Sequence, residues 1–176
     1  MSMLRLFFAL QPTPEQNIAL TAQVAPLIGG AQPVRAENLH ATLCFIGALE
    51  TEKLDGLRAV AANVHARRVE LRFDTLEHWD GPKIVCATTS EESEFARDLA
   101  VALGEATIAA GFTPDIKPFR AHLTLARKVS RDLSVAFPQP LMPSTIVRCD
   151  RFVLMQSRRD ESGSVYSAVD SWALYD

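Results

Sequence analysis

The chain has 176 residues, of which 48% are apolar and 22% are charged, and its formal net charge at pH 7 is −3. This length supports one hydrophobic core and no linker interrupts it, so we expect a single domain covering residues 1–176. The negative charge argues against a protein that coats nucleic acid through a broad basic surface, and the apolar runs are too short to span a membrane.

The first part of the chain predicts two strands separated by a helix. Residues 5–10 form an apolar run that stops at a Gln-Pro pair, which is typical of a buried strand. A helix is predicted after Thr13, which supplies an N-cap and is followed by a proline and then a glutamine at the third helical position. We expect a distortion of this helix at Pro26. Residues 39–46 are a second predicted strand, ended by Gly47.

The middle of the chain predicts two helices and two strands. Apolar residues keep helical spacing between 54 and 64, and residues 69–76 and 84–88 are predicted strands. The clearest helix is expected to begin after residues 89–90 and to end at Gly111. Its predicted apolar stripe consists of Phe95, Leu99, Ala102, Leu103, Ala106 and Ala110.

The last part of the chain predicts strands at residues 121–126, 147–155 and 166–174. Neighbouring strands in this half favour an α+β sandwich of sheet and helices over a doubly wound parallel fold. No glycine-rich phosphate loop follows any predicted strand, which argues against a Rossmann or P-loop nucleotide site.

The three cysteines, Cys44, Cys86 and Cys149, lack the spacing of a metal site or a redox pair. We therefore expect buried thiols, and neither a metal ion nor a cofactor. No small-residue cleavage site follows the N-terminal apolar run, so we expect no signal peptide and a cytoplasmic location without a membrane partner. We expect a monomer.

The sequence His-x-Thr-Leu occurs at His40 and again at His122, 82 residues later (122 minus 40). Residue frequencies give this repeat a chance probability of about three in ten thousand. Side chains of a strand alternate between two faces, so each histidine shares a face with Thr42 or Thr124, opposite an apolar face. The spacing of about half the chain suggests two similar halves that set the motifs across a shared cleft.

Two imidazoles across a cleft suit the cleavage of a phosphodiester. One can take a proton from the nucleophile while the other gives a proton to the leaving oxygen, because histidine titrates near neutral pH. The hydroxyls of Thr42 and Thr124 can donate to the non-bridging phosphate oxygens and stabilise charge without a metal ion. Arg127 is the nearest cation, but alternation places it on the wrong face, so it reaches the phosphate only if the strand ends or bulges after Leu125.

These motifs resemble those of the two-histidine phosphoesterases, and among them the RNA 2′,3′-cyclic phosphodiesterases, also called 2′-5′ RNA ligases. The similar segments are "RLFFAL", "ENLHATLCFIG", "FRAHLTLAR" and a C-terminal series of Ser157, Tyr166 and Trp172. The resemblance covers most of the chain. Two positions depart from the family pattern, because Ala121 stands where proline is usual and Ala41 replaces a commonly larger residue.

The resemblance implies an α+β fold with two pseudo-symmetric lobes of antiparallel sheet, packed with helices around a central groove. It also implies metal-independent opening of a 2′,3′-cyclic phosphate at an RNA end to a 2′-phosphate, with 2′-5′ RNA ligase activity as a further expectation. On this resemblance His40 and His122 are catalytic, and Thr42, Thr124 and Arg127 bind the phosphate. The family pattern makes His40 the acid on O3′ and His122 the base on water, a distinction that the sequence alone does not make.

Phe7 and Phe45 are the candidates for stacking on the terminal base, although alternation places Phe45 toward the core. Trp79 is a further aromatic residue that could line the groove. Two other functions stay open: a non-catalytic module that holds a nucleotide phosphate, and a phosphodiesterase for a small cyclic nucleotide such as ADP-ribose cyclic phosphate. The intact histidines favour the enzyme, and the modest basic surplus in the second half suits a short RNA end better than a long duplex.

Overall fold

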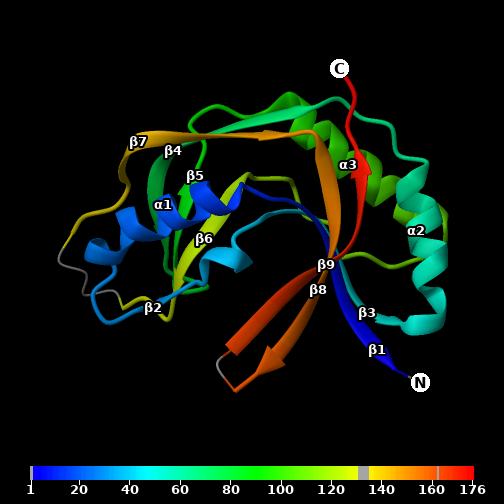
Figure 1. The fold of residues 1–176 in the computed structure, drawn as a ribbon, viewed down its shortest axis with the longest axis horizontal. Helices are drawn as coiled ribbons and strands as arrows, with labels where there is room; N and C mark the ends of the chain where they lie inside the picture. Colours follow the sequence, from blue (N-terminus) through cyan, green and yellow to red (C-terminus); the bar gives the residue numbers. More distant parts are fainter. Residues whose placement is uncertain (1, 131–134, 162) are drawn as a thin grey trace.

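Two sheets form the framework of the computed structural model, which describes residues 2–130, 135–161 and 163–176 (Figure 1). The first sheet has the strand order β3-β1-β8-β9, and the second has the order β2-β6-β5-β4-β7. Every pairing between these strands is antiparallel. The strands are β1 (Met3–Leu10), β2 (Gln32–Pro33), β3 (Ala41–Glu50), β4 (Val69–Trp79), β5 (Ile84–Thr88), β6 (His122–Arg127), β7 (Gln139–Cys149), β8 (Arg151–Asp160) and β9 (Gly163–Ala173).

Three α-helices pack against these sheets. They are α1 (Pro14–Val24), α2 (Leu54–Ala62) and α3 (Glu94–Ala109), and short 3₁₀ turns lie at Ala25–Leu27, Ala36–Asn38 and Thr51–Lys53. Helix α1 packs against β6 and β7 of the second sheet, α2 packs against β9 and α3, and α3 reaches both β3 and β4. In Figure 1, α1 lies on the side of the molecule opposite α2. The predicted fold of two antiparallel lobes packed with helices is therefore confirmed. Among the described residues, no helix is long and apolar enough to cross a membrane.

Strand β1 is apolar from Leu6 to Leu10 because this part of it is buried on both faces. It lies between β3 and β8, so neither edge of the strand is free. One face enters the main core of the protein, and the other face belongs to a smaller cluster that includes residues of β8. Leu6, Phe8 and Leu10 belong to the main core, whereas Phe7 and Ala9 belong to the smaller cluster with Val153 and Met155. A strand buried in this way shows a continuous apolar run in place of alternation.

The predicted start of helix α1 is confirmed by its capping box. Thr13 Oγ1 accepts a hydrogen bond from the backbone N–H of Gln16 at 3.3 Å, and Gln16 Oε1 accepts one from the backbone N–H of Thr13 at 3.1 Å. The two bonds satisfy amide groups that have no partner within the helix. The α-helix changes to a 3₁₀ turn at Ala25–Leu27, where Pro26 cannot donate a backbone hydrogen bond.

The prediction of one continuous strand at residues 147–155 is wrong, because these residues belong to two strands in different sheets. Strand β7 ends at Cys149 and belongs to the second sheet, whereas β8 begins at Arg151 and belongs to the first. Between them, the carbonyl of Asp150 accepts a hydrogen bond from the N–H of Leu174 at 2.7 Å. Apolar residues continue on both sides of this position, so the pattern could not indicate a change of sheet.

Other boundaries also differ from expectation, most clearly those of β3 and α3. Strand β3 continues past Gly47 to Glu50, because a φ angle of 83° at this glycine accommodates a shift in its pairing with β1. Helix α3 starts later than predicted, with Ser93 as its N-cap. Phe95 was expected on the buried stripe but is 41% exposed, because the buried face of α3 is centred on Ala96, Leu99 and Leu103.

The cysteines behave as predicted, since Cys44, Cys86 and Cys149 are free and buried. Burial raises the pKa of Cys44 and Cys149 to about 11 and that of Cys86 to about 12. In the described part of the chain, no group of three or more His, Cys, Asp or Glu side chains could hold a metal ion.

Phe8 offers a direct test of the main core. It is fully buried, and its ring centroid lies 6.0 Å from that of Phe152 and 5.9 Å from that of Trp172. We expect Phe8→Ala to lower the free energy of unfolding by about 3–5 kcal/mol in urea denaturation, because it removes packing and leaves a cavity. The control Phe95→Ala removes a partly exposed ring and should cost about 1 kcal/mol or less. Equal losses would contradict this packing.

Candidate active site

Each His-x-Thr-Leu motif contains a β-bulge at its leucine. In the first motif, Phe8 of β1 pairs with Cys44 and Ala9 pairs with Thr42, so Leu43 has no partner of its own. In the second motif, the corresponding shift in the pairing of β5 with β6 leaves out Leu125. The bulges stand three residues after His40 and three residues after His122, so the two motifs share one backbone irregularity.

The bulges decide which side chains face the groove. Without a bulge, a residue five positions after the histidine would point away from it. With the bulge, Arg127 lies on the same face as His122 and Thr124. The sequence analysis expected Arg127 on this face only if the strand ended or bulged after Leu125, and the strand does bulge at that position. The bulge at Leu43 has the same effect on Phe45, so its expected core orientation is wrong and its half-buried ring lines a cavity beside the motifs.

Both imidazoles are held by the backbone two residues earlier. His40 Nδ1 lies 2.7 Å from the carbonyl oxygen of Asn38, and His122 Nδ1 lies 2.9 Å from that of Arg120. A carbonyl only accepts, so each Nδ1 carries a proton and donates. In the neutral imidazole, Nε2 then keeps its lone pair and is the atom available for proton transfer.

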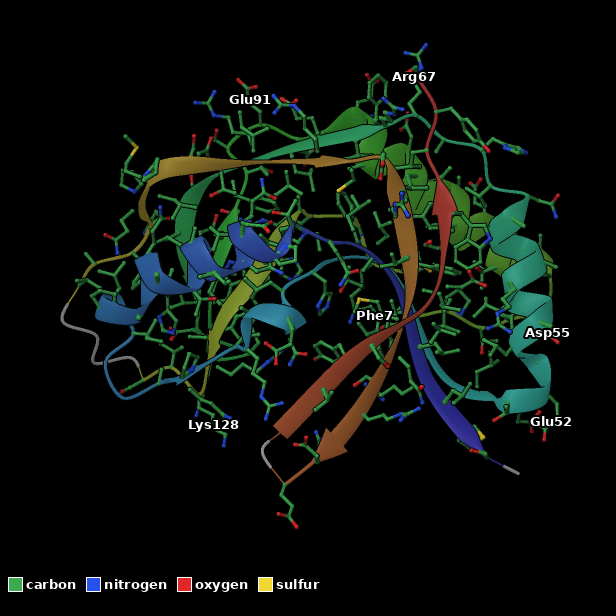
Figure 2. All side chains as sticks on the ribbon, in the orientation of Figure 1. Phe7, Glu52, Asp55, Arg67, Glu91 and Lys128 are labelled. Atoms are coloured by element: carbon green, nitrogen blue, oxygen red, sulfur yellow. The ribbon has the colours of Figure 1, made fainter. Side chains whose placement is uncertain are left out.

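Aromatic side chains fix the orientation of both imidazoles. The ring centroid of His40 lies 4.7 Å from that of Phe7 and 5.0 Å from that of Tyr166, and His122 lies 4.8 Å from Trp79. Phe7, labelled in Figure 2, is only 3% exposed and does not offer an open face to a base, which argues against its expected role in base stacking. Trp79 packs directly on His122, whereas in the sequence only its aromatic character suggested a place in the groove.

The motifs share a cavity between the two sheets, as their repeat predicted. The cavity has a volume of about 650 Å³ and is lined by Thr42 of the first motif and His122 of the second. Phe45 and Trp79 contribute rings to its wall, and the guanidinium of Arg5 lies 4.7 Å from the Phe45 ring centroid. A second hollow of about 450 Å³ is lined by Arg127, Lys128, Arg159 and Tyr166 among others. Lys128 points outward at the end of β6 (Figure 2).

Burial is the main electrostatic influence on both histidines. The pKa of His40 is lowered to about 4, first by burial and then by the charges of His122 and Arg127, while the Asn38 carbonyl acts in the opposite direction. Burial also lowers the pKa of His122, opposed by the Arg120 carbonyl and reinforced by the charges of Arg120 and Arg127. Both imidazoles are therefore neutral near pH 7 until an anion binds beside them.

Two polar side chains near the histidines escaped the sequence analysis. Asn38 is buried, donates from Nδ2 to the carbonyl of Ser164 at 2.7 Å, and accepts from the N–H of Tyr166 at 3.1 Å. Glu77 accepts hydrogen bonds near His122. Asn38 stands among the quoted flanks of the first motif, but nothing in the pattern around Glu77 distinguished it from other charged residues of a strand.

The chain is similar to proteins of one phosphoesterase family. The family model described as "LigT like Phosphoesterase" matches residues 9–85. A protein of Escherichia coli named RNA 2′,3′-cyclic phosphodiesterase is 29% identical over 173 residues, which cover 97% of this chain and 96% of that protein. An Archaeoglobus fulgidus protein of the same name is 30% identical over 142 residues, which cover 76% of this chain and 77% of that protein.

The fold is similar to that of a solved member. The crystal structure of Escherichia coli LigT in apo form superposes with a TM-score of 0.87 at 26% identity and covers the whole of both chains. The same protein has been crystallised in complex with 3′-AMP, and that structure superposes with a TM-score of 0.86 at 27% identity over 99% of this chain and 100% of that chain.

The lowered pKa values predict a pH-dependent stability. The unfolded chain binds a proton at each histidine near pH 6.5, whereas folded His40 does so only near pH 4. Between these values the unfolded state binds more protons, so the free energy of unfolding falls as the pH is lowered. We expect the urea midpoint to fall more between pH 7 and pH 5 in the wild type than in His40→Gln. An identical fall in both proteins would contradict the burial of this imidazole.

Proposed function

Because the chain belongs to the LigT-like phosphoesterase family, we propose that it hydrolyses the 2′,3′-cyclic phosphate at an RNA end and leaves a 2′-phosphate. The relatives from Escherichia coli and Archaeoglobus fulgidus are named for action on this cyclic phosphate. One observation carries the proposal: His40 and His122 are held alike, each with Nδ1 on a carbonyl and Nε2 available for proton transfer.

The reaction needs one base and one acid. The base takes a proton from water at its Nε2 while the water oxygen forms a bond to phosphorus. The bond between phosphorus and O3′ breaks, and the acid gives the proton on its Nε2 to O3′. One water molecule is consumed, and the phosphate stays on O2′. The two imidazoles supply both proton transfers, so we propose that the reaction proceeds without a metal ion.

Charge on the phosphate is stabilised by groups that share the face of the histidines. The hydroxyls of Thr42 and Thr124 each lie two residues after a motif histidine and can donate to non-bridging oxygens. Arg127 adds a cation from the end of β6, turned toward this face by the bulge at Leu125. These donors stand on two strands from different sheets, so they can hold the phosphate from two sides.

We propose His40 as the acid on O3′ and His122 as the base on water. Burial lowers the pKa of His40 to about 4, which leaves it neutral before the substrate binds. The anionic cyclic phosphate favours the protonated imidazole, so substrate binding must raise this pKa before His40 can donate. His122 starts neutral, as a base must, since burial lowers its pKa as well.

The cavity beside the motifs is the proposed place for the terminal nucleoside. Its volume of about 650 Å³ falls within the range of small-molecule sites, and Phe45 and Trp79 supply aromatic surface. Phe45 has the orientation needed to meet a base, because its bulge turns it out of the core. A base that stacks on Phe45 must share the ring with the guanidinium of Arg5, which already covers part of it.

Two related activities use the same site. The 5′-hydroxyl of a second RNA in the place of water would form a 2′-5′ bond, which is the ligase reaction. A small cyclic nucleotide in the place of an RNA end would use the same acid and base. A module that only binds the phosphate would not require both Nε2 atoms to be available, so the matched histidines favour an enzyme.

The first test is hydrolysis of a short RNA that ends in a 2′,3′-cyclic phosphate, in the presence of EDTA. We expect the wild type to form the 2′-phosphate, and His40→Ala and His122→Ala each to lower kcat by about 10²- to 10⁴-fold with smaller effects on binding. A strict requirement for an added divalent metal would contradict the mechanism. Binding without conversion would favour the binding module or a smaller cyclic nucleotide.

The role of Arg127 has its own test. We expect Arg127→Ala to lower kcat/KM by about 10²-fold, because it removes a cation from the developing charge, and Arg127→Lys to retain part of the activity. Arg148→Ala is the matched control. Arg148 lies on β7, forms an ion pair with Glu70 at 2.8 Å and lines neither cavity. Equal activity of the two alanine variants would remove Arg127 from the phosphate site.

A further inference from the structure

We propose that Glu77 is a positioning residue for His122, which it orients by tying together the groups that surround the imidazole. Glu77 lies on β4 (Val69–Trp79) with a side chain that is 23% exposed. It is not part of either histidine motif, and the reaction described above assigns it no proton and no contact with the phosphate. Its effect on catalysis rests on the proposed function, but its effect on His122 can be measured without substrate.

One carboxylate joins three residues. Glu77 Oε2 accepts a hydrogen bond from Trp79 Nε1 at 2.6 Å, and Oε1 accepts one from Thr88 Oγ1 at 3.0 Å. Arg120 Nη2 donates to both oxygens, at 2.7 Å and 2.8 Å. These partners come from β4, from the end of β5 and from the segment before β6, so Glu77 connects three parts of the chain.

Each of these three residues is a neighbour of His122. The ring centroid of Trp79 lies 4.8 Å from that of the imidazole, and the carbonyl of Arg120 accepts a hydrogen bond from His122 Nδ1. Thr88 is the residue of β5 that pairs with His122 in the sheet. The guanidinium of Arg120 also lies 4.9 Å from the Trp79 ring centroid, so the carboxylate holds a stacked pair against the histidine. Loss of Glu77 would release all three groups together.

The other histidine is supported by the same plan with different chemistry. The carbonyl of Asn38 holds His40 Nδ1, and the Asn38 side chain is bonded to β9 at Ser164 and Tyr166. Tyr166 in turn packs its ring on His40. In both motifs, a polar side chain thus links the residue that holds Nδ1 to the aromatic residue that packs on the imidazole. This repetition distinguishes the Glu77 network from an incidental surface ion pair.

Glu77 also forms an ion pair with Arg120 beside His122. Burial acts to raise the pKa of Glu77, but hydrogen bonds from Trp79 and Thr88 and the charge of Arg120 outweigh it and hold the pKa below its usual value. The ionised carboxylate compensates the guanidinium of Arg120, which lowers the pKa of His122. The other titratable or charged groups around this site are Arg127 on β6, Cys86 on β5, His40 in the first motif, and Arg5, Asp115 and Lys117 across the cavity.

The kinetic test compares Glu77→Ala and Glu77→Gln with a control on the same strand. We expect Glu77→Ala to lower kcat by about 10- to 100-fold with KM little changed, because a misplaced imidazole affects proton transfer more than binding. Glu77→Gln keeps an acceptor for Trp79 or Thr88 and should retain more activity. Glu70→Ala removes a carboxylate from an exposed ion pair with Arg148 and should behave like the wild type.

The second measurement is an NMR titration of the imidazoles, which needs no substrate. We expect Glu77→Ala to lower the pKa of His122, because Arg120 loses its compensating charge, and to leave that of His40 near its wild-type value. Adding Arg120→Ala should return the pKa of His122 toward the wild type. Should the wild type fail to hydrolyse the RNA, the proposed function would fall while this titration still tests Glu77.

Two results would overturn the proposal. One is a folded Glu77→Ala protein with wild-type kcat and an unchanged His122 titration. The other is a loss of activity that only follows the unfolded fraction, with normal kcat for each folded molecule. If Glu77→Ala does not fold, Glu77→Gln and Trp79→Phe decide the question, because the latter removes the Nε1 donor and keeps a ring. Wild-type titration curves for His122 in both variants would then refute the role.

Discussion

One extra residue in each His-x-Thr-Leu motif determines the chemistry of the groove. An unbroken strand would turn the residue five positions after each histidine away from the groove, and the proposed phosphate site would lose a cation on one side and an aromatic ring on the other. The bulges at Leu43 and Leu125 prevent this, because they turn Phe45 and Arg127 onto the histidine face. The backbone deviation at the leucine is the same in both motifs, whereas the side chain that it turns onto the histidine face differs. Two similar halves thereby present an aromatic ring, Phe45, on one side of the groove and a cation, Arg127, on the other.

The sequence was most informative where chemistry and periodicity coincide. The two histidines, the paired threonines and the capped start of α1 were visible because each depends on residues close together in the chain. The change of sheet at Asp150 could not be predicted, since the residues on both sides are apolar and only the strands with which they pair are different. The orientation of Phe45 was hidden for the same reason, because a bulge depends on the neighbouring strand. Arg127 was an intermediate case, in which the sequence could state the bulge it needed but could not establish it.

The supports of the two histidines agree in geometry and differ in charge. Asn38 holds its side of the groove with a neutral amide, whereas the other side uses an ionised carboxylate and a guanidinium. His40 also packs between two rings, while His122 has one aromatic neighbour and more charged ones. Two imidazoles of equal chemistry are thus given unequal surroundings, as the proposed acid and base roles require.

The order of strands in the first sheet has a consequence for synthesis of the protein. This sheet combines β1 and β3 from the beginning of the chain with β8 and β9 from its end, and Tyr166 of β9 completes the surroundings of His40. A ribosome releases the chain from its N-terminus, so the first motif emerges long before its partners. The second sheet lacks β7 until late as well. The surroundings of His40 are therefore completed only when translation is nearly finished, and a shortened chain that ends before β8 carries both histidines but lacks the Tyr166 ring that packs on His40.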